Sequence, residues 1–255
     1  MTDSSGQTVS EPSAGKPVHV RLGVIVPTTN TVNEAEWRTI AARLGGMSLH
    51  VSRILLTEAL HDAANGLPDD LRAAMRPLEQ AEVDLIAYGC TAGSLVLPLD
   101  ALTGAMQRAS ARPCVATAPA LIAACRTLGV SRVSIGTPYA ELLNSHERSF
   151  FEDAGLRVDR IVGLGIGAGG MHEYTRIAKL TPDEVEALAV SALAEGSEAL
   201  VLSCTDLPTL ALIPRFEARF GIPVMSSNLA TLWNALRTAG IDTPVTGFGS
   251  LLELR

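Results

Sequence analysis

Two cysteines occupy matching positions in the two halves of this 255-residue chain, and both are placed for chemistry. Cys90 and Cys204 each follow a short apolar run that is typical of a buried strand, and each precedes a threonine and a predicted helical segment. The carboxyl end of such a strand is where α/β proteins bind ligands, and N–H groups at a helix start lower the pKa of a thiol. One of the two could therefore be a thiolate at neutral pH. The pair predicts a cleft with a cysteine on each wall, one to attack or remove a proton and the other to deliver one.

Cysteines can also have roles other than catalysis. Free cysteines are common as small buried hydrophobic residues, and this is the alternative for the pair. No CxxC or HxxxH spacing supplies the further ligands of a metal site, so no metal is expected. We expect Cys114, in a short buried strand, and Cys125, on an alanine- and leucine-rich helix, to be structural. Four cysteines without a secretion signal fit the reducing cytoplasm.

Polar groups follow the same predicted strand ends as the cysteines. The segment Val26-Pro-Thr-Thr-Asn-Thr31 ends the first strand, either as a turn with a helix cap or as a cradle for a substrate carboxylate. Tyr139, at the matching end in the second half, could donate its hydroxyl to a carboxylate or simply pack. Asp206 could orient a thiol, bind a substrate ammonium or stabilise the next helix as a first-turn acid. The candidate substrate-binding residues are Thr28, Asn30, Thr91, Ala92, Tyr139, Thr205 and Asp206.

The composition narrows the classes of partner. Aromatic residues make up only 4% of the chain, which argues against a surface that stacks nucleic acid bases or sugars. The net charge is −7 without a basic stripe, so nucleic acids and anionic membranes are poor partners. No apolar run approaches the roughly 20 residues that span a bilayer. We expect a small carboxylate substrate, held by local N–H groups rather than by the overall charge.

Short β-rich segments alternate with amphipathic helical segments, which predicts an α/β fold with mostly parallel sheets covered by helices. The expected strands are Val18–Val26, Ser48–Arg53, Val83–Tyr88, Pro113–Ala116, Arg132–Gly136, Leu156–Val162, Ala199–Ser203 and Pro223–Met225. The expected helices are Val32–Leu44, Asp69–Ala81, Ser94–Ala109, Pro119–Leu128, Tyr139–Ala154, Thr181–Ala194, Pro208–Phe220 and Ser227–Ala239.

The two halves of the chain resemble each other. The segment Cys114–Gly129 parallels Val224–Gly240, and both end in Arg-Thr-x-Gly. A repeat of this length indicates a duplicated domain rather than a solenoid. We therefore expect two similar Rossmann-like lobes related by a pseudo-twofold duplication, with the active site in the cleft between them. The first lobe would hold residues 18–118 and 226–255 and the second residues 119–225, after a disordered tail at residues 1–17.

A glycine-rich segment runs from Gly163 to Gly170 and contains a loose GxGxxG pattern. It lacks a helix start directly after it and an acidic residue at the end of a following strand, which dinucleotide binding requires. We therefore expect no cofactor here, and interpret the segment as a flexible loop that covers the cleft.

Four segments together resemble the aspartate/glutamate racemase superfamily, and within it the branch of maleate cis–trans isomerases and arylmalonate decarboxylases. The resemblance covers nearly the whole chain after the tail. Its motifs are Gly23-Val-Ile-Val-Pro-Thr-Thr-Asn-Thr31, Tyr88-Gly-Cys-Thr-Ala-Gly-Ser94, Ser203-Cys-Thr-Asp-Leu-Pro208, and Ile213-Pro214 through Gly221-Ile-Pro-Val-Met-Ser-Ser227.

The resemblance implies cofactor-independent chemistry beside a carboxylate. In maleate isomerases, the cysteine matched by Cys90 adds to the alkene of maleate, and elimination after bond rotation gives fumarate. The cysteine matched by Cys204 handles the proton, while Asn30 and Tyr139 match residues that hold the carboxylates. Arylmalonate decarboxylases carry glycine where Cys90 stands, so the presence of both thiols disfavours decarboxylation. A homo-oligomer is usual for such enzymes.

Two departures from the isomerase pattern keep other functions open. The chain has Cys204-Thr-Asp206 where maleate isomerases typically have Cys-Val-Gln, and Gly167-Ala-Gly-Gly170 where they place an asparagine. The second hypothesis is an amino-acid or hydantoin-type racemase, in which the two cysteines act as opposed acid and base and Asp206 binds the ammonium. A third is a non-catalytic metabolite-binding protein on the same scaffold.

Overall fold

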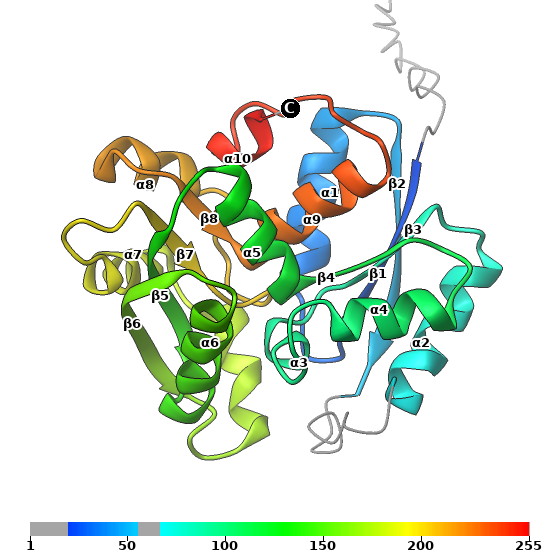
Figure 1. Ribbon diagram of the computed structural model, residues 1–255, viewed down its shortest axis with the longest axis horizontal. Coiled ribbons are helices and arrows are strands. Elements are labelled where there is room, and N and C mark those ends of the chain that lie inside the picture. Colours follow the sequence, from blue (N-terminus) through cyan, green and yellow to red (C-terminus); the bar gives the residue numbers. More distant parts are fainter. Residues whose placement is uncertain (1–19, 56–66, 255) are drawn as a thin grey trace, which may run out of the picture.

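Two four-stranded sheets form the framework of the molecule. The computed structural model describes residues 20–55 and 67–254 (Figure 1). Every strand pair in these residues is parallel, and the order is β2-β1-β3-β4 in one sheet and β6-β5-β7-β8 in the other. The repeated order confirms the predicted duplication and the two-lobed α/β fold. The tail expected at residues 1–17 lies outside the described residues.

The first sheet and the helices that connect its strands come from the first half of the chain. In order, they are β1 (Val20–Pro27), α1 (Asn33–Leu44), β2 (Met47–Ile54), α2 (Asp69–Gln80), β3 (Leu85–Tyr88), α3 (Thr91–Ser94), α4 (Ala101–Ala109) and β4 (Cys114–Ala116). All four side chains of β3 are buried, as expected for a strand with helices on both faces of the sheet.

The second sheet repeats this plan after the helix α5 (Thr117–Thr127). Its elements are β5 (Arg132–Tyr139), α6 (Glu141–Asp153), β6 (Arg157–Ile166), the 3₁₀ segment η3 (Met171–Lys179), α7 (Pro182–Ala192), β7 (Ala199–Leu202), α8 (Ile213–Phe220) and β8 (Val224–Ser226). The helix α7 begins with the capping box and the proline that its sequence predicts. The chain ends with α9 (Ser227–Thr238) and α10 (Ser250–Glu253).

Helices α5 and α9 lie side by side at the centre of the molecule, with the sheets on either side (Figure 1). Each follows the last strand of its own sheet, and α9 also packs on β3 and β4. The hydroxyl of Thr231 on α9 donates a hydrogen bond to the hydroxyl of Thr117 on α5 at 3.0 Å. The two halves are therefore joined by buried helix packing, so the strand ends beside these helices face one another.

Two expected helices differ from the structure. The helix predicted over Ser94–Ala109 is interrupted, because residues 95–100 form a loop between α3 and α4. Pro98 disfavours helical conformation in the residue before it, and Asp100 has a left-handed φ of 68°. The helix predicted from Pro208 begins only at Ile213, after a series of turns.

The segment between residues 139 and 180 also differs from expectation. Tyr139 ends β5 instead of beginning a helix, and β6 extends through Gly163 and Gly165 to Ile166. The glycine-rich segment is thus half strand and half turn, and the following η3 had no counterpart in the predicted elements. None of the helices within residues 20–55 and 67–254 combines the length and apolar character needed to cross a bilayer.

Candidate active site

Cys90 and Cys204 line one cavity between the two halves of the molecule. Its walls come from residues that end or follow the four strands β1, β3, β5 and β7, and from η3. The lining residues are Pro27, Thr29, Asn30, Cys90, Thr91, Ala92, Tyr139, Tyr174, Ile177, Cys204, Thr205 and Asp206. The cavity has a volume of about 40 Å³, which is room for about three water molecules. Both predicted thiols and most of the predicted binding residues therefore meet at one place.

Cys90 lies two residues after the end of β3 and caps the start of α3. Its Sγ accepts a hydrogen bond from the backbone N–H of Gly93 at 3.3 Å. The hydroxyl of the next residue, Thr91, donates to Ser227 of α9 at 2.9 Å, and the hydroxyl of Ser94 donates to the Thr91 carbonyl at 2.9 Å. These bonds fix the turn that presents the Cys90 thiol to the cavity.

Cys204 follows β7 in the same way but enters a turn instead of a helix. Its Sγ accepts from the backbone N–H of Asp206 at 3.4 Å, and the hydroxyl of Tyr139 lies beside the sulfur. The backbone N–H of Leu207 donates to the Cys204 carbonyl at 3.2 Å. Because α8 starts nine residues later, at Ile213, no helix start supports this thiol. The expected symmetry of the two cysteine settings is therefore incomplete.

Burial dominates the acidity of both thiols. It raises the pKa of Cys90, against the effect of the Gly93 N–H and the Tyr88 hydroxyl. It raises the pKa of Cys204 to about 12; the Tyr139 hydroxyl and the Asp206 N–H oppose this, and the charges of Asp206 and Cys90 add to it. The prediction that helix N–H groups leave one cysteine as a thiolate at neutral pH is therefore wrong for this state of the cavity. Both thiols therefore keep their protons at neutral pH. Of the two, only Cys204 has a carboxylate, that of Asp206, among the charges that raise its pKa.

Asn30 joins the two halves at the floor of the site. Its Oδ1 accepts from the backbone N–H groups of Val32 and Asn33 at 3.1 and 3.0 Å, which caps α1. Its Nδ2 donates to the hydroxyl of Thr205 at 3.0 Å, and that hydroxyl donates in turn to the Gly89 carbonyl at 3.0 Å. The cap expected from the sequence is thus present, and one N–H of the Asn30 amide remains for a ligand.

Asp206 reaches across the same boundary with one of its two carboxyl oxygens. Oδ1 accepts from the backbone N–H groups of Thr31 and Val32 at 2.8 and 3.2 Å, just before α1. The acid therefore stabilises a helix start, as one reading of the sequence had it, but that of α1 and not of the helix after it. Oδ2 is buried without a hydrogen-bond partner among the described residues, and burial raises the pKa of this carboxyl to about 6.

Glu36 and Asn228 complete the contact between the halves behind the site. The Glu36 carboxylate on α1 accepts from the N–H groups of Thr209 and Leu210 at 2.7 and 2.8 Å, and from the amide of Asn228 at 2.7 Å. Asn228 accepts from the amide of Asn33 at 2.6 Å. Buried polar groups that are satisfied in this way specify one relative placement of their elements.

Tyr139 is held at the end of β5 by its own neighbours. Its backbone N–H donates to the hydroxyl of Thr137 at 3.1 Å, and that hydroxyl donates to Asn144 at 2.5 Å. A Cβ on Gly163 would lie 2.2 Å from the Asn144 Nδ2 and 2.3 Å from the Tyr139 carbonyl oxygen. Glycine at this position therefore permits the close packing that sets the position of Tyr139.

The structure does not bring every predicted binding residue to the cavity. Thr28 is exposed, its N–H donates to the Ile54 carbonyl at 2.9 Å, and it is not among the lining residues. Its neighbour Thr29 lines the cavity instead. In a turn after a strand, one residue of displacement decides which side chain faces the site, and the sequence around Thr28 gives no signal for this choice.

Sequence reasoning missed Tyr174 and Ile177, which reach the cavity from η3. The turn before η3 is held by Glu173, whose Oε2 accepts from the N–H groups of Gly167 and Gly169 at 2.7 and 3.2 Å. A Cβ on Gly167 would lie 2.7 Å from the Tyr174 ring. The glycine-rich segment thus leads into η3, and the residues that reach the cavity belong to η3 and not to Gly163–Gly170. That the segment itself covers the cleft stays a prediction. Whether it moves stays a prediction.

Glu147 is a second residue that was missed. It lies on α6, fully buried, and its Oε1 accepts a hydrogen bond from the hydroxyl of Ser203, the residue before Cys204. Its Oε2 has no partner among the described residues. Burial raises the pKa of this carboxyl to about 7, and its charge raises the pKa of the Tyr139 phenol in addition to the effect of burial. A second titratable acid therefore lies on the Cys204 side of the site.

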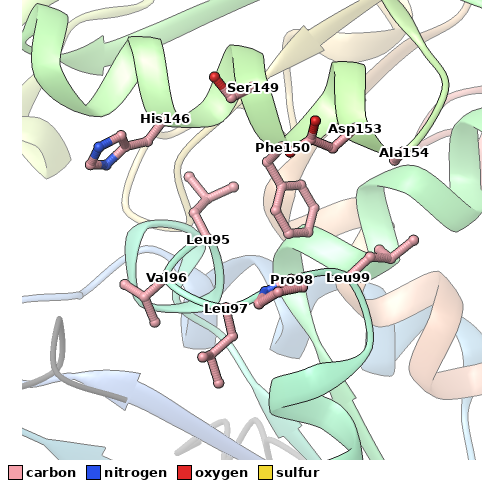
Figure 2. Close-up of a pocket in the computed structure, with 10 residues that line it drawn as sticks. All are labelled: Leu95, Val96, Leu97, Pro98, Leu99, His146, Ser149, Phe150, Asp153 and Ala154. Atoms are coloured by element: carbon pink, nitrogen blue, oxygen red, sulfur yellow. The ribbon is translucent and has the colours of Figure 1, made fainter. Parts of the chain in front are cut away.

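A larger cavity of about 560 Å³ carries no comparable chemistry. It lies between the loop at residues 95–99 and α6, and Phe150 points from α6 toward that loop (Figure 2). Its titratable residues are His146 and Asp153, without a cysteine. Across residues 20–55 and 67–254, no three His, Cys, Asp or Glu side chains gather as metal ligands would. The smaller cavity is the candidate active site.

Comparisons with known proteins agree with this fold and cavity. A model of the arylmalonate decarboxylase family matches residues 49–252. The maleate isomerase of Geobacillus stearothermophilus is 25% identical over 92% of this chain and 98% of its own length. The arylmalonate decarboxylase of Bordetella bronchiseptica is 35% identical over 60% of this chain and 63% of its own. A crystal structure of a cysteine-to-alanine variant of the maleate isomerase Iso from Pseudomonas putida S16, with maleate, aligns with a TM-score of 0.81 at 25% identity, over 92% of this chain and 97% of that one.

Proposed function

The chain belongs to the arylmalonate decarboxylase family, and on that premise we propose that it is a cofactor-independent cis–trans isomerase of a small dicarboxylate, with maleate as the first candidate. The observation that carries the proposal is the convergence of Cys90 and Cys204 on one cavity from the two halves of the chain. Similarity to maleate isomerases over nine-tenths of the chain supports it. The decarboxylases that the chain resembles carry glycine where Cys90 stands, so decarboxylation is less well supported.

In the proposed reaction Cys90 loses its proton to water and adds through sulfur to one alkene carbon of the substrate. The electron pair of the double bond moves to the neighbouring carbon, which takes the proton of the Cys204 thiol. The former double bond is now single and rotates. Cys204 then removes the proton from the same carbon, the double bond re-forms, and the C–S bond breaks to release the trans product and the Cys90 thiolate.

Neutral groups from both halves would hold the two carboxylates. Among the described residues no lysine or arginine lines the cavity, so hydroxyl and amide donors take that role: Thr29, Asn30, Thr91, Tyr139 and Thr205. The cavity, with room for about three water molecules, is narrow for a four-carbon dicarboxylate. We expect binding to move part of the wall outward, and η3, with Tyr174 and Ile177, is the part of the wall that neither ends nor directly follows a strand.

Incubation with maleate, followed by proton NMR of fumarate, tests the proposal. The wild-type protein is expected to convert maleate to fumarate, the Cys90→Ala variant to do so no faster than buffer, and the Cys125→Ala variant to match wild type. Cys125 is a suitable control because it is fully buried in the core and away from the cavity. Failure of the wild-type protein to form fumarate, or full activity of the Cys90→Ala variant, would contradict the proposal.

Amino-acid or hydantoin racemisation is the second candidate, and Asp206 is the observation that favours it. Its Oδ2 is unpartnered in the wall of the cavity, where a carboxylate would attract an ammonium and repel a dianion. The two cysteines would then remove and return the Cα proton from opposite faces. Exchange of the Cα proton with deuterium from solvent, measured across amino acids and hydantoins, decides the matter. Without either reaction, the hypothesis of a metabolite-binding protein remains.

Two further predictions concern assembly. We propose that residues 18–118 with 226–255 form the first lobe and residues 119–225 the second, a division supported by the packing of α9 on β3 and β4. We also propose a homo-oligomer, as is usual for the enzymes that this chain resembles. Light scattering on the purified protein measures its mass in solution, and a monomer would contradict the second prediction.

A further inference from the structure

The hydroxyl of Tyr88 is an anomaly of the buried core. Tyr88 ends β3, its side chain has no exposed surface, and its hydroxyl has no hydrogen-bond partner among the described residues. Leaving a buried hydroxyl unpaired is destabilising, so a phenylalanine would serve packing better. An unsatisfied group of this kind calls for an explanation outside stability.

The surroundings of this hydroxyl point to Cys90. Cys90 follows Tyr88, the last residue of β3, by two positions in an extended backbone conformation, and the two residues pack in the same apolar cluster. A Cβ on Gly93 would lie 2.2 Å from the Tyr88 hydroxyl oxygen, so the hydroxyl lies directly against the turn of α3. The N–H of that same Gly93 donates to the Cys90 sulfur at 3.3 Å. The hydroxyl and the N–H that binds the Cys90 sulfur therefore meet at the same residue, Gly93.

We propose that Tyr88 is a positioning residue, whose hydroxyl donates a hydrogen bond to the Cys90 sulfur once that sulfur is a thiolate. Tyr88 does not line the cavity, so it would act on the nucleophile from behind and without touching the substrate. The inference rests on the proposed role of Cys90.

The chemistry of sulfur explains why the Tyr88 hydroxyl makes no hydrogen bond while Cys90 is protonated. A neutral thiol is a weak acceptor, whereas hydrogen bonds to an ionised group are about twice as strong. Burial raises the pKa of the Tyr88 phenol, and the charge of an ionised Cys90 raises it further, so the phenol keeps its proton as a donor. The Tyr88 hydroxyl thus gains a strong acceptor only when Cys90 ionises. The thiolate is the form of Cys90 that the proposed reaction uses.

The Tyr88→Phe variant tests the inference through the acidity of Cys90, without any turnover. The rate of alkylation of Cys90 by iodoacetamide is measured against pH, with the modified peptides identified by mass spectrometry. Loss of one hydrogen bond to the thiolate is expected to raise the pKa of Cys90 by about one unit, which slows its alkylation near neutral pH about tenfold. The melting temperature is expected to stay the same or to rise, because the variant removes an unsatisfied group.

Cys114 is the internal reference for packing defects. It lies in the same cluster, on the neighbouring strand β4. A variant that merely loosened this cluster would make both Cys90 and Cys114 react faster, and that result would overturn the inference. An unchanged pH profile of Cys90 would overturn it as well. If the wild-type protein has no isomerase activity but Tyr88→Phe still raises the pKa of Cys90, the proposed function is contradicted. The inferred role of Tyr88 would then still stand.

Gly93→Ala supplies a second test that does not depend on the first variant folding. Its new Cβ must displace the Tyr88 hydroxyl. The variant is expected to raise the pKa of Cys90 when Tyr88 is present and to raise it less when combined with Tyr88→Phe, since the two changes remove the same hydrogen bond. Fully additive shifts in the double variant, or no shift in the single one, would overturn the inference.

Discussion

The Cys90 and Cys204 regions share a frame but differ in charge. Each cysteine follows a central strand, accepts a backbone N–H, at 3.3 Å from Gly93 and at 3.4 Å from Asp206, and has a tyrosine hydroxyl beside it. Among the described residues, the acids lie on the Cys204 side: Asp206 two residues after the thiol, and Glu147 bonded to the residue before it. The duplication explains the shared setting of the two cysteines. The acids in the second half make the surroundings of Cys204 more negative than those of Cys90.

This difference supports the proposed roles of the two cysteines. Carboxylates near Cys204 disfavour its thiolate and suit it to hold and deliver a proton. Cys90 has no carboxylate among the groups that shift its pKa, which supports the proposal that it ionises first and acts as the nucleophile. Each of the following predictions would weaken or refine that contrast.

Removing each thiol has the largest expected effect. Cys90→Ala is expected to lower kcat/KM on the order of 10⁴-fold or more, as loss of a nucleophile does, because the covalent path is lost. Cys204→Ala is expected to cost about 10²–10⁴-fold, the usual contribution of a positioned acid or base. Steady-state kinetics with maleate measures both. Equal losses, or the reverse order, would break the contrast.

Asp206→Asn changes charge with little change in shape, and Asn can still accept at Oδ1. For a dianionic substrate the variant is expected to lower KM about tenfold, because an anion is removed from the wall of the cavity. For an amino-acid substrate it is expected to raise KM by a similar factor, because the ammonium loses its partner. The sign of the change in KM therefore separates isomerase from racemase, and Cys125→Ala is the matched neutral control.

Glu147→Gln acts on stability and its dependence on pH. Burial raises the pKa of this carboxyl from 4.5 to about 7, so the folded protein holds its proton longer than the unfolded chain. The contribution of the protonated group is complete below about pH 4.5 and is lost as the pH rises through about 7. The shift corresponds to at most about 3 kcal/mol of unfolding free energy.

The matching measurement is urea denaturation of wild type and Glu147→Gln at several pH values. The unfolding free energy of the variant, relative to wild type, is expected to rise between pH 5 and pH 8, since glutamine does not ionise. Other carboxyls titrate in both proteins and cancel in the difference. A difference that does not vary with pH would remove Glu147 from the description of the Cys204 side.

Gly167→Ala has the smallest expected effect and tests the wall formed by η3. Gly167 has a left-handed φ of 100°, and a Cβ there would lie 2.7 Å from the Tyr174 ring. Displacing Tyr174 is expected to change KM severalfold and kcat little, because the cysteines keep their places. The exposed Thr28→Ala change, outside the cavity, is expected to leave both parameters unchanged. A large loss of kcat in Gly167→Ala would show that η3 also shapes the reacting geometry.

The sequence predicted the fold well because the features that carry it are local. Every strand was found to within a few residues, since apolar runs such as Leu85–Tyr88 and Ala199–Leu202 stand between polar turns. The helix over Ser94–Ala109 was wrong because composition outweighed Pro98 in the prediction. The meeting of the two cysteines followed from the duplication, which places both after equivalent central strands.

Contacts between residues that are distant along the chain could not be predicted from the sequence. The Asp206 carboxylate binds N–H groups at the start of α1, and Glu147 bonds to Ser203, each across more than fifty positions of the chain. The acidity of the thiols was misjudged because burial, a property of the whole cavity, outweighs the few N–H groups that local reasoning had in view. The roles of Tyr174 and Tyr88 were missed for the same reason. Neither residue belongs to a sequence pattern from which its contacts could be predicted.

The most direct test is to find which cysteine becomes bonded to the substrate. Cys90→Ala and Cys204→Ala are incubated with maleate, and the intact proteins and their peptides are examined by mass spectrometry. The account predicts that Cys204→Ala gains the mass of one maleic acid at Cys90, and that Cys90→Ala gains none at Cys204. An adduct at Cys204 in Cys90→Ala, with none at Cys90 in the other variant, would contradict it.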